Sequence, residues 1–256
     1  KEANTHIYNF TLEKKALQSS AEQYQSKLRE LSQAIHAATN DFYREKAVNS
    51  AYLTKKESCS DKDRDFLFKL ISSNKVYKEL ASIFPTKEPC FLNTQLFFDP
   101  FNIKQKNYWH RDIQYTGLGL AEQKKSVEED TNNVVHFRFA IRDENGIELI
   151  PNTNKRWDSS LEYDTRLSLN GRLPSDNLPD GETIALNRGD LLIFSANMIH
   201  RGLYGKDRLS FDVLFCKPDP EILCYADLNC YPEKDKFKNL DNESIFRKLY
   251  EIKSSG

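Results

Sequence analysis

The stretch that decides the fold of this chain is residues 189–202, which read GDLLIFSANMIHRG. A turn at Gly189 and Asp190 leads into a short apolar run, and the stretch ends on a histidine, an arginine and a second glycine. Short apolar runs bounded by turn residues are typical of buried β-strands. The stretch therefore predicts a buried strand that delivers His200 to one end of a sheet.

The distribution of glycine and proline divides the chain into two regions. All nine glycines lie at or after Gly117 and all nine prolines at or after Pro85, and eight of the glycines fall between Gly117 and Gly205. A long stretch without glycine or proline favours helices, whereas frequent turn residues favour a meandering or jelly-roll sheet. We expect a mostly β fold with flanking α: support helices in 1–88, a jelly-roll core in 89–217 and a tail in 218–256, all in one domain.

Helices are expected in the N-terminal region. Apolar residues from Leu17 to Phe42 recur at helical spacing, which fits either a coiled-coil seam or, as we favour, an amphipathic helix that covers a sheet. A second helix begins near Ser60, a suitable N-cap, and a third runs over 76–83 and is stopped by Pro85.

Short β-rich segments follow, separated by polar turns, and a final helix is expected near Asn242–Ile252. The predicted strands are Cys90–Phe98, Asn107–Asp112, Asn133–Arg142, Ile147–Ile150, Thr183–Asn187, Asp190–Ser195 and Arg208–Lys217. Asp143–Gly146 is read as the turn of a hairpin, and the polar segment Pro151–Asp180 as a long loop or lid over one end of the sheet.

Composition excludes several classes of protein. Thirty-seven basic residues against thirty-eight acidic ones give a net charge of -1, which leaves no basic footprint for nucleic acid or an anionic membrane. The apolar run Leu191–Ile199 is too short to span a bilayer. Five cysteines without CxxC spacing favour a reducing, cytoplasmic location. The chain begins at Lys1, so an earlier targeting segment stays open, as does the oligomeric state.

Three residues could bind a metal ion together. His110 and Asp112 are two apart, and on a strand such residues point to the same side. With His200 at the mouth of its own strand, they make a set of two histidines and one carboxylate. This set is the facial triad of non-haem Fe(II) sites, which leaves coordination positions open for oxygen chemistry.

Arg208 and Ser210 form a second candidate site on the next strand, where their side chains share a face. A guanidinium holds a carboxylate by two parallel hydrogen bonds, and a serine hydroxyl adds a third. The pair therefore predicts a clamp for the distal carboxylate of a dicarboxylic co-substrate whose other end chelates the iron.

Taken in order, the motifs Trp109-His110-x-Asp112, DENGIELIP at 143–151, 189–202 and Arg208-x-Ser210 resemble the phytanoyl-CoA dioxygenase family of Fe(II)/2-oxoglutarate oxygenases. The resemblance covers about half of the chain. It implies a double-stranded β-helix, iron at His110, Asp112 and His200, and 2-oxoglutarate at Arg208 and Ser210.

The resemblance also implies that Asn93 or Gln95 contacts the other end of 2-oxoglutarate. One departure is Pro151-Asn152-Thr153-Asn154, where members often read Pro-Gly-Ser-His. The carboxylate of Asp112 favours hydroxylation over halogenation, because the related halogenases lack it.

The sequence thus predicts a dioxygenase that uses Fe(II), 2-oxoglutarate and O2 to oxidise a C–H bond of a small molecule, releasing succinate and CO2. The alternative is a non-catalytic jelly-roll that binds a metabolite or sugar. The arginines at 111, 138 and 156 favour an anionic substrate. The candidate substrate contacts are Arg138, Gln114, Tyr115, Arg156 and Trp157.

Overall fold

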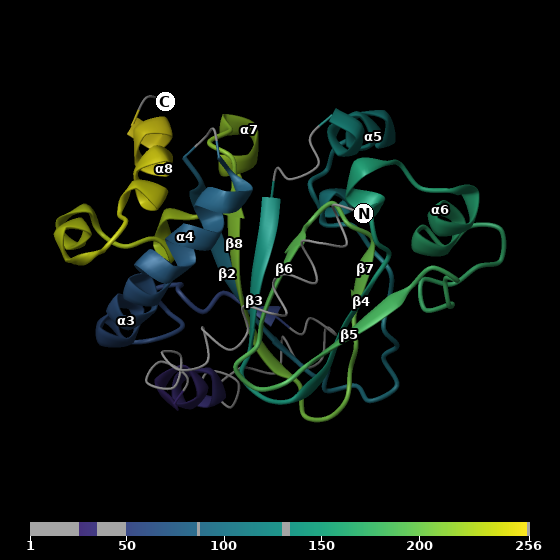
Figure 1. Ribbon diagram of the computed structural model, residues 1–256, viewed down its shortest axis with the longest axis horizontal. Helices are drawn as coiled ribbons and strands as arrows, with labels where there is room; N and C mark the ends of the chain where they lie inside the picture. Colours follow the sequence, from purple (N-terminus) through teal and green to yellow (C-terminus); the bar gives the residue numbers. More distant parts are fainter. Residues whose placement is uncertain (1–25, 35–49, 86–87, 130–133, 255–256) are drawn as a thin grey trace.

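The computed structural model describes residues 26–34, 50–85, 88–129 and 134–254 of the chain. Its strands form two antiparallel sheets that pack face to face (Figure 1). The larger sheet has the order β1 (Ser50–Ala51), β2 (Cys90–Phe98), β8 (Leu209–Cys216), β3 (Val134–Ala140) and β6 (Leu191–Ser195). The smaller has the order β5 (Glu182–Leu186), β4 (Glu144–Leu149) and β7 (His200–Gly202).

From β3 onward the chain changes sheets at every step except that from β4 to β5, and this repeated crossing between two sheets is the topology of a jelly-roll. β3 lies in the larger sheet and β4 in the smaller, β5 in the smaller and β6 in the larger, and β7 and β8 repeat the alternation. The jelly-roll prediction is therefore confirmed. The hairpin expected at Asp143–Gly146 is wrong, because the strands on either side of it do not pair and Glu144 already begins β4.

Helices cover the outer face of the larger sheet (Figure 1). They are α3 (Asp61–Ile71), α4 (Asn74–Ile83), α8 (Ser244–Ser254) and the helix over 26–34. Ser60 caps α3 as expected, since its side chain accepts a hydrogen bond from the backbone of Asp63. The rest of the predicted stripe from Leu17 to Phe42 lies outside the described residues. None of the helices in the described part of the chain is long and apolar enough to cross a membrane.

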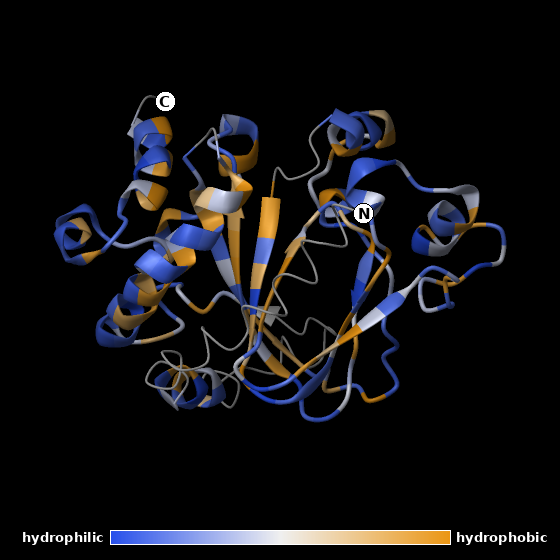
Figure 2. Ribbon diagram, in the orientation of Figure 1, coloured by the Kyte–Doolittle hydropathy of each residue, from blue (hydrophilic) through white to orange (hydrophobic). Residues whose placement is uncertain are grey.

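Side chains of the larger sheet alternate between a helix-facing layer and an inward layer. Leu96 and Phe211 are cross-strand neighbours in the apolar core under the helices. One residue earlier on β2 and one later on β8, Gln95 and Asp212 are neighbours that point inward, with Arg138 of β3 beside Asp212. Figure 2 shows that β3 has hydrophilic stretches between hydrophobic ones. The interior between the sheets is thus partly polar.

Two parts of the chain are helical where the sequence predicted no helix. α5 (Leu120–Glu129) lies near one end of the sheets, and α6 (Ser160–Arg166) lies within the segment expected to be a long loop. α6 begins with a capping box in which Ser159 and Glu162 each bond to the other's backbone N–H. The remaining short helices are α7 (Pro220–Leu223), η1 (Asp112–Tyr115), η2 (Thr153–Lys155), η3 (Leu228–Cys230) and η4 (Lys234–Asn239).

The strand expected at Asn107–Asp112 does not form as a regular strand. Only His110 makes a β-bridge there, opposite His200, and Asp112 starts the 3-10 helix η1. The segment lies beside β7, the three-residue strand at one edge of the smaller sheet, and pairs with it through this one bridge. His110 and Asp112 therefore do not share a face of a regular strand.

Candidate metal centre

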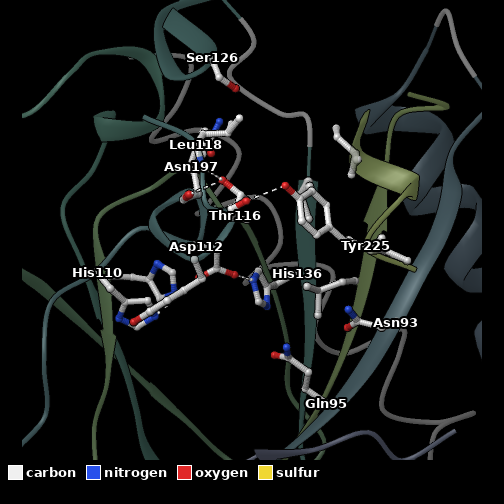
Figure 3. Close-up of a pocket in the computed structure, with 18 of the residues that line it drawn as sticks. Asn93, Gln95, His110, Asp112, Thr116, Leu118, Ser126, His136, Asn197 and Tyr225 are labelled. Carbon is white, nitrogen blue, oxygen red and sulfur yellow. Dashed lines mark hydrogen bonds and ion pairs between the residues drawn. The ribbon is translucent and has the colours of Figure 1, made fainter. Parts of the chain in front are cut away.

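His110, Asp112 and His200 meet because backbone bonds tie their segments together. His110 and His200 exchange two hydrogen bonds, with N···O distances of 2.9 and 3.0 Å, and the backbone N–H of Asp112 donates to Ala196 at 3.1 Å. One possible ligand atom from each of the three residues lies within 4.8 Å of the others. Figure 3 shows His110 and Asp112 directed to the same place in the cavity.

Backbone carbonyls fix the tautomers of both histidines. Nδ1–H of His110 donates to the carbonyl oxygen of Tyr108 at 3.1 Å, and Nδ1–H of His200 donates to that of Met198 at 2.8 Å. A carbonyl oxygen only accepts, so in each ring the proton sits on Nδ1 and the Nε2 lone pair is free in the neutral form. This is the arrangement that metal-binding histidines need.

The electrostatics keep both rings neutral. Burial, together with the neighbouring His110, lowers the pKa of His200 to about 3, and burial also lowers the pKa of His110. Burial opposes ionisation of Asp112, but the charge and hydrogen bond of His136 outweigh it and hold the pKa of Asp112 well below its usual range. The site therefore offers two neutral imidazoles and one carboxylate.

The spacing of these donors fits a transition-metal ion. Nε2 of His110 lies 3.6 Å from Oδ1 of Asp112, and Nε2 of His200 lies 3.5 Å from the same oxygen. Adjacent donors around an ion with bonds of about 2.1 Å stand about 3 Å apart, so small movements would close the site. Two nitrogens and one oxygen on one side of an ion are the donor set of a non-haem Fe(II) centre.

A cavity of about 1360 Å³ opens from this group toward the larger sheet. The structure brings five further predicted residues to its wall: Asn93, Gln95, Tyr115, Arg138 and Arg208. Figure 3 shows Asn93 and Gln95 on the side of the cavity opposite His110. The candidate metal donors and the candidate clamp arginine thus face one space.

Arg208 is buried, and one of its hydrogen-bond donors has no acceptor among the described residues. Its side chain is 2% exposed, Nε has no hydrogen-bond partner among the described residues, and the nearest carboxylate oxygen, on Glu144, is 3.8 Å away. Oγ of Ser210 is also buried without a hydrogen bond in the described part of the chain. Buried polar groups left unbonded cost stability, so the pair fits an absent carboxylate.

Gly202 shapes the place of the Arg208 guanidinium. A Cβ at Gly202 would lie 2.7 Å from both Nη1 and Nη2 of Arg208. The guanidinium therefore packs directly on the backbone of β7, and any side chain at this position would displace it.

Sequence reasoning missed a buried chain of charges behind the metal donors. Nε2 of His136 lies 2.7 Å from Oδ2 of Asp112, and its Nδ1 lies 3.1 Å from Oδ2 of Asp212. Arg138 donates to both oxygens of Asp212, at 2.9 and 3.1 Å. Continuing the period-2 pattern from Ser210 would have placed Asp212 on the same face of its strand, although it would not have identified the partners of Asp212.

His136 is doubly protonated in this setting. Both of its partners are carboxylates, which only accept, so both ring nitrogens must donate. Burial alone would lower the pKa of His136, but Asp112 and Asp212 outweigh it and raise that pKa to about 9. The polar face of β3 is therefore part of a buried ion-pair network with Asp112 and Asp212.

Three of the predicted substrate contacts are absent from the cavity wall. Gln114 accepts a hydrogen bond from Arg166 at 2.6 Å, and Arg156 pairs with Glu162. The guanidinium groups of Arg111 and Arg166 lie 5.7 and 5.9 Å from the centre of the Trp157 ring. These contacts secure the segment around α6, which is the physical reason that these side chains do not reach the cavity.

The arginines at 111, 138 and 156, from which an anionic substrate was predicted, already have partners within the chain. The Arg111 side chain is fully buried, with bonds to Asp158 and to the Thr153 carbonyl, and like Arg156 it is not part of the cavity wall. Arg138 does line the cavity, but Asp212 neutralises it.

Comparisons with known proteins support the fold. Neither protein-family models nor curated proteins match this chain. Among solved structures, EctD from S. alaskensis with 2-oxoglutarate and 5-hydroxyectoine is 12% identical, with a TM-score of 0.51 over 77% of this chain and 68% of that chain. The chain shares the fold of EctD.

Two further structures have lower TM-scores. The non-heme monooxygenase ThoJ in its nickel complex is 16% identical, with a TM-score of 0.47 over 78% of this chain and 69% of that one. Apo HygX from Streptomyces hygroscopicus is 12% identical, with a TM-score of 0.49 over 73% and 78%.

Proposed function

We propose that this chain is an Fe(II)- and 2-oxoglutarate-dependent dioxygenase that oxidises a C–H bond of a small molecule and releases succinate and CO2. The finer assignment, based on the motifs, is to the phytanoyl-CoA dioxygenase family. One observation carries the proposal: a single cavity joins a group of two histidines and a carboxylate to a buried arginine whose Nε lacks a hydrogen-bond partner within the described chain.

His110, Asp112 and His200 would hold the iron. When bound, the iron supplies the activation of O2 that is coupled to oxidative decarboxylation of 2-oxoglutarate, and the protein supplies binding, orientation and exclusion of water. The two histidines are suited to this task, since their Nδ1 bonds keep the Nε2 lone pairs directed at one point.

Arg208 and Ser210 would bind the distal carboxylate of 2-oxoglutarate. Both have unbonded buried atoms. Burial and the neighbouring Arg138 lower the pKa of Arg208, and the carboxylate of Glu144, 3.8 Å from its Nε, opposes that shift. Asn93 or Gln95 would contact the end of 2-oxoglutarate nearer the metal, and Tyr115 and Arg138 remain the proposed substrate contacts, because all four line the cavity.

One structure of the same fold supplies a precedent for the co-substrate, since the EctD structure contains 2-oxoglutarate and 5-hydroxyectoine. We also propose that the chain is one oxygenase domain acting in the cytoplasm, with hydroxylation as its reaction.

Release of succinate and CO2 tests the proposal most directly. The protein should form both from 2-oxoglutarate in the presence of Fe(II), O2 and substrate candidates, and His200→Ala should abolish that formation. A second test uses a redox-silent metal such as Zn²⁺. 2-Oxoglutarate should then raise the melting temperature of the wild-type chain but not of His200→Ala. Equal turnover by the variant, or no stabilisation of the wild type, would contradict the proposal and favour a binding protein.

A further inference from the structure

We propose, on the basis of the function assigned above, that His136 is a positioning residue that keeps Asp112 a one-oxygen ligand of the metal. The two carboxylate oxygens of Asp112 have different partners. Oδ1 faces Nε2 of His110 and Nε2 of His200, at 3.6 and 3.5 Å. Oδ2 turns away and accepts from Nε2 of His136 at 2.7 Å, the contact drawn in Figure 3.

The short hydrogen bond from His136 sets the orientation of the Asp112 carboxylate. To bind a metal through both oxygens, Asp112 would have to rotate Oδ2 away from Nε2 of His136 and break this 2.7 Å bond. The rotation would leave a buried ring nitrogen without its partner, and an unpaired buried polar group is costly, so Oδ2 stays with His136.

His136 itself has little freedom to follow such a rotation. It is 3% exposed, Asp212 binds its Nδ1, and the ring stacks on Phe194 with centroids 4.6 Å apart and planes 9° apart. Phe194 is its cross-strand neighbour on β6. Asp212 is fixed in turn by two bonds from Arg138. Three adjacent strands of the larger sheet thus hold one hydrogen-bond donor against Asp112.

This arrangement has a consequence for coordination. A facial set of two histidines and a one-oxygen carboxylate leaves three open positions on an octahedral ion, whereas a two-oxygen carboxylate leaves two. A co-substrate that binds through two atoms, followed by O2, needs all three. His136 therefore protects the number of open positions rather than supplying a ligand, in line with its absence from the group of candidate donors in the described chain.

The test compares the wild type with His136→Leu, His136→Gln and a matched control, Phe137→Leu. Gln keeps a donor for Oδ2 of Asp112, whereas Leu keeps bulk without a donor. Phe137 is the next residue of β3, fully buried, but faces the helices and does not touch the site. It reports what a core defect in this strand does by itself.

Two readouts besides activity are measured on the full chain. The first is Co²⁺ affinity and the intensity of its visible bands, which depend on coordination number. The second is the absorption that 2-oxoglutarate produces when it chelates Fe(II) without O2. His136→Leu should lower Co²⁺ affinity about 10–100-fold, the range typical for loss of a partner of a metal ligand. It should also alter the Co²⁺ spectrum and weaken chelation by 2-oxoglutarate.

His136→Gln should recover most of the Co²⁺ affinity, and Phe137→Leu should lower the melting temperature while leaving both spectra as in the wild type. Wild-type affinity and spectra in His136→Leu would overturn the inference. So would a loss of affinity as large as that of His200→Ala, since His136 would then be a ligand. If the wild type binds Co²⁺ but shows no 2-oxoglutarate absorption with Fe(II), the proposed function fails, while the Co²⁺ comparison still decides the role of His136.

Discussion

The metal-binding end of the molecule and the charged interior behind it are built in opposite ways. His110 and Asp112 lie on an irregular segment, which two backbone hydrogen bonds tie to His200 and one ties to Ala196. His136, Arg138 and Asp212 lie in the middle of regular strands, paired by register. The first region depends on a few backbone hydrogen bonds between two irregularly paired segments, and the second on which strands are neighbours. Function and stability should therefore respond differently to changes in the two.

The largest expected effect on metal binding comes from His110→Ala. Removing a ligand should lower Co²⁺ affinity by more than the hundredfold expected for a supporting residue. The side chain of His110 is 16% exposed and has one backbone partner, so the free energy of unfolding of the metal-free chain should change by less than about 1 kcal/mol. Metal titration and urea denaturation check both halves. A large loss of metal-free stability would remove the contrast between the two regions.

Asp212→Ala should affect the stability of the metal-free chain more than His110→Ala does. Asp212 is fully buried between His136 and Arg138, so its loss leaves buried positive charge without a partner. Such a loss costs about 3–5 kcal/mol of the free energy of unfolding. Urea denaturation without metal measures it, with Asp212→Asn as the control that keeps the shape and some hydrogen bonds. A cost under about 1 kcal/mol would show that the network is not structural.

Arg208→Lys tests the proposed carboxylate clamp, which lines the same cavity as the metal donors and precedes β8 of the charged interior. A lysine keeps the charge but loses the forked geometry, and hydrogen bonds to charged groups contribute about 1.5–3 kcal/mol each. The KM for 2-oxoglutarate should rise about tenfold to a hundredfold with a smaller change in kcat. Arg201→Lys is the matched control, because Arg201 is also buried but bonds to Glu148 and does not line the cavity. An unchanged KM in Arg208→Lys would remove Arg208 from the site.

Gly202→Ala should have the smallest effect. The added Cβ pushes the Arg208 guanidinium from its place, and a side chain forced off its preferred rotamer loses about 0.5–1.5 kcal/mol. The KM for 2-oxoglutarate should rise by about two- to tenfold. Because both changes act through the same guanidinium, the double variant with Arg208→Lys should be no worse than Arg208→Lys alone. Full additivity would mean that Gly202 acts elsewhere.

Much of the fold could be predicted because its signals are local. The limits of β2, the N-cap of α3 and the jelly-roll class follow from apolar periodicity, a capping residue and turn residues that are close in the sequence. The same signals were misread at Asp143–Gly146, since a tight turn looks alike whether it joins two strands of one sheet or of two. α6 was missed although its capping box, Ser159 with Glu162, was visible in the sequence.

The candidate site divides in the same manner. His110, Asp112, His200 and Arg208 could be selected by spacing and chemical type. The partners of His136 could not, because the register that puts Arg138 opposite Asp212 depends on β3 and β8 being neighbours, and strand order is not written in either strand. The same holds for Arg111, whose buried contacts come from the segment after β4.

The paired backbones of His110 and His200 also bear on how the protein reaches its native state. The two histidines are far apart in the sequence, and their mutual bonds join the segment after β2 to the start of β7. Closing so long a loop is entropically costly and is expected late in folding. A partly folded chain would present isolated histidines with little affinity for metal. Tight metal uptake would then mark a chain that has finished folding.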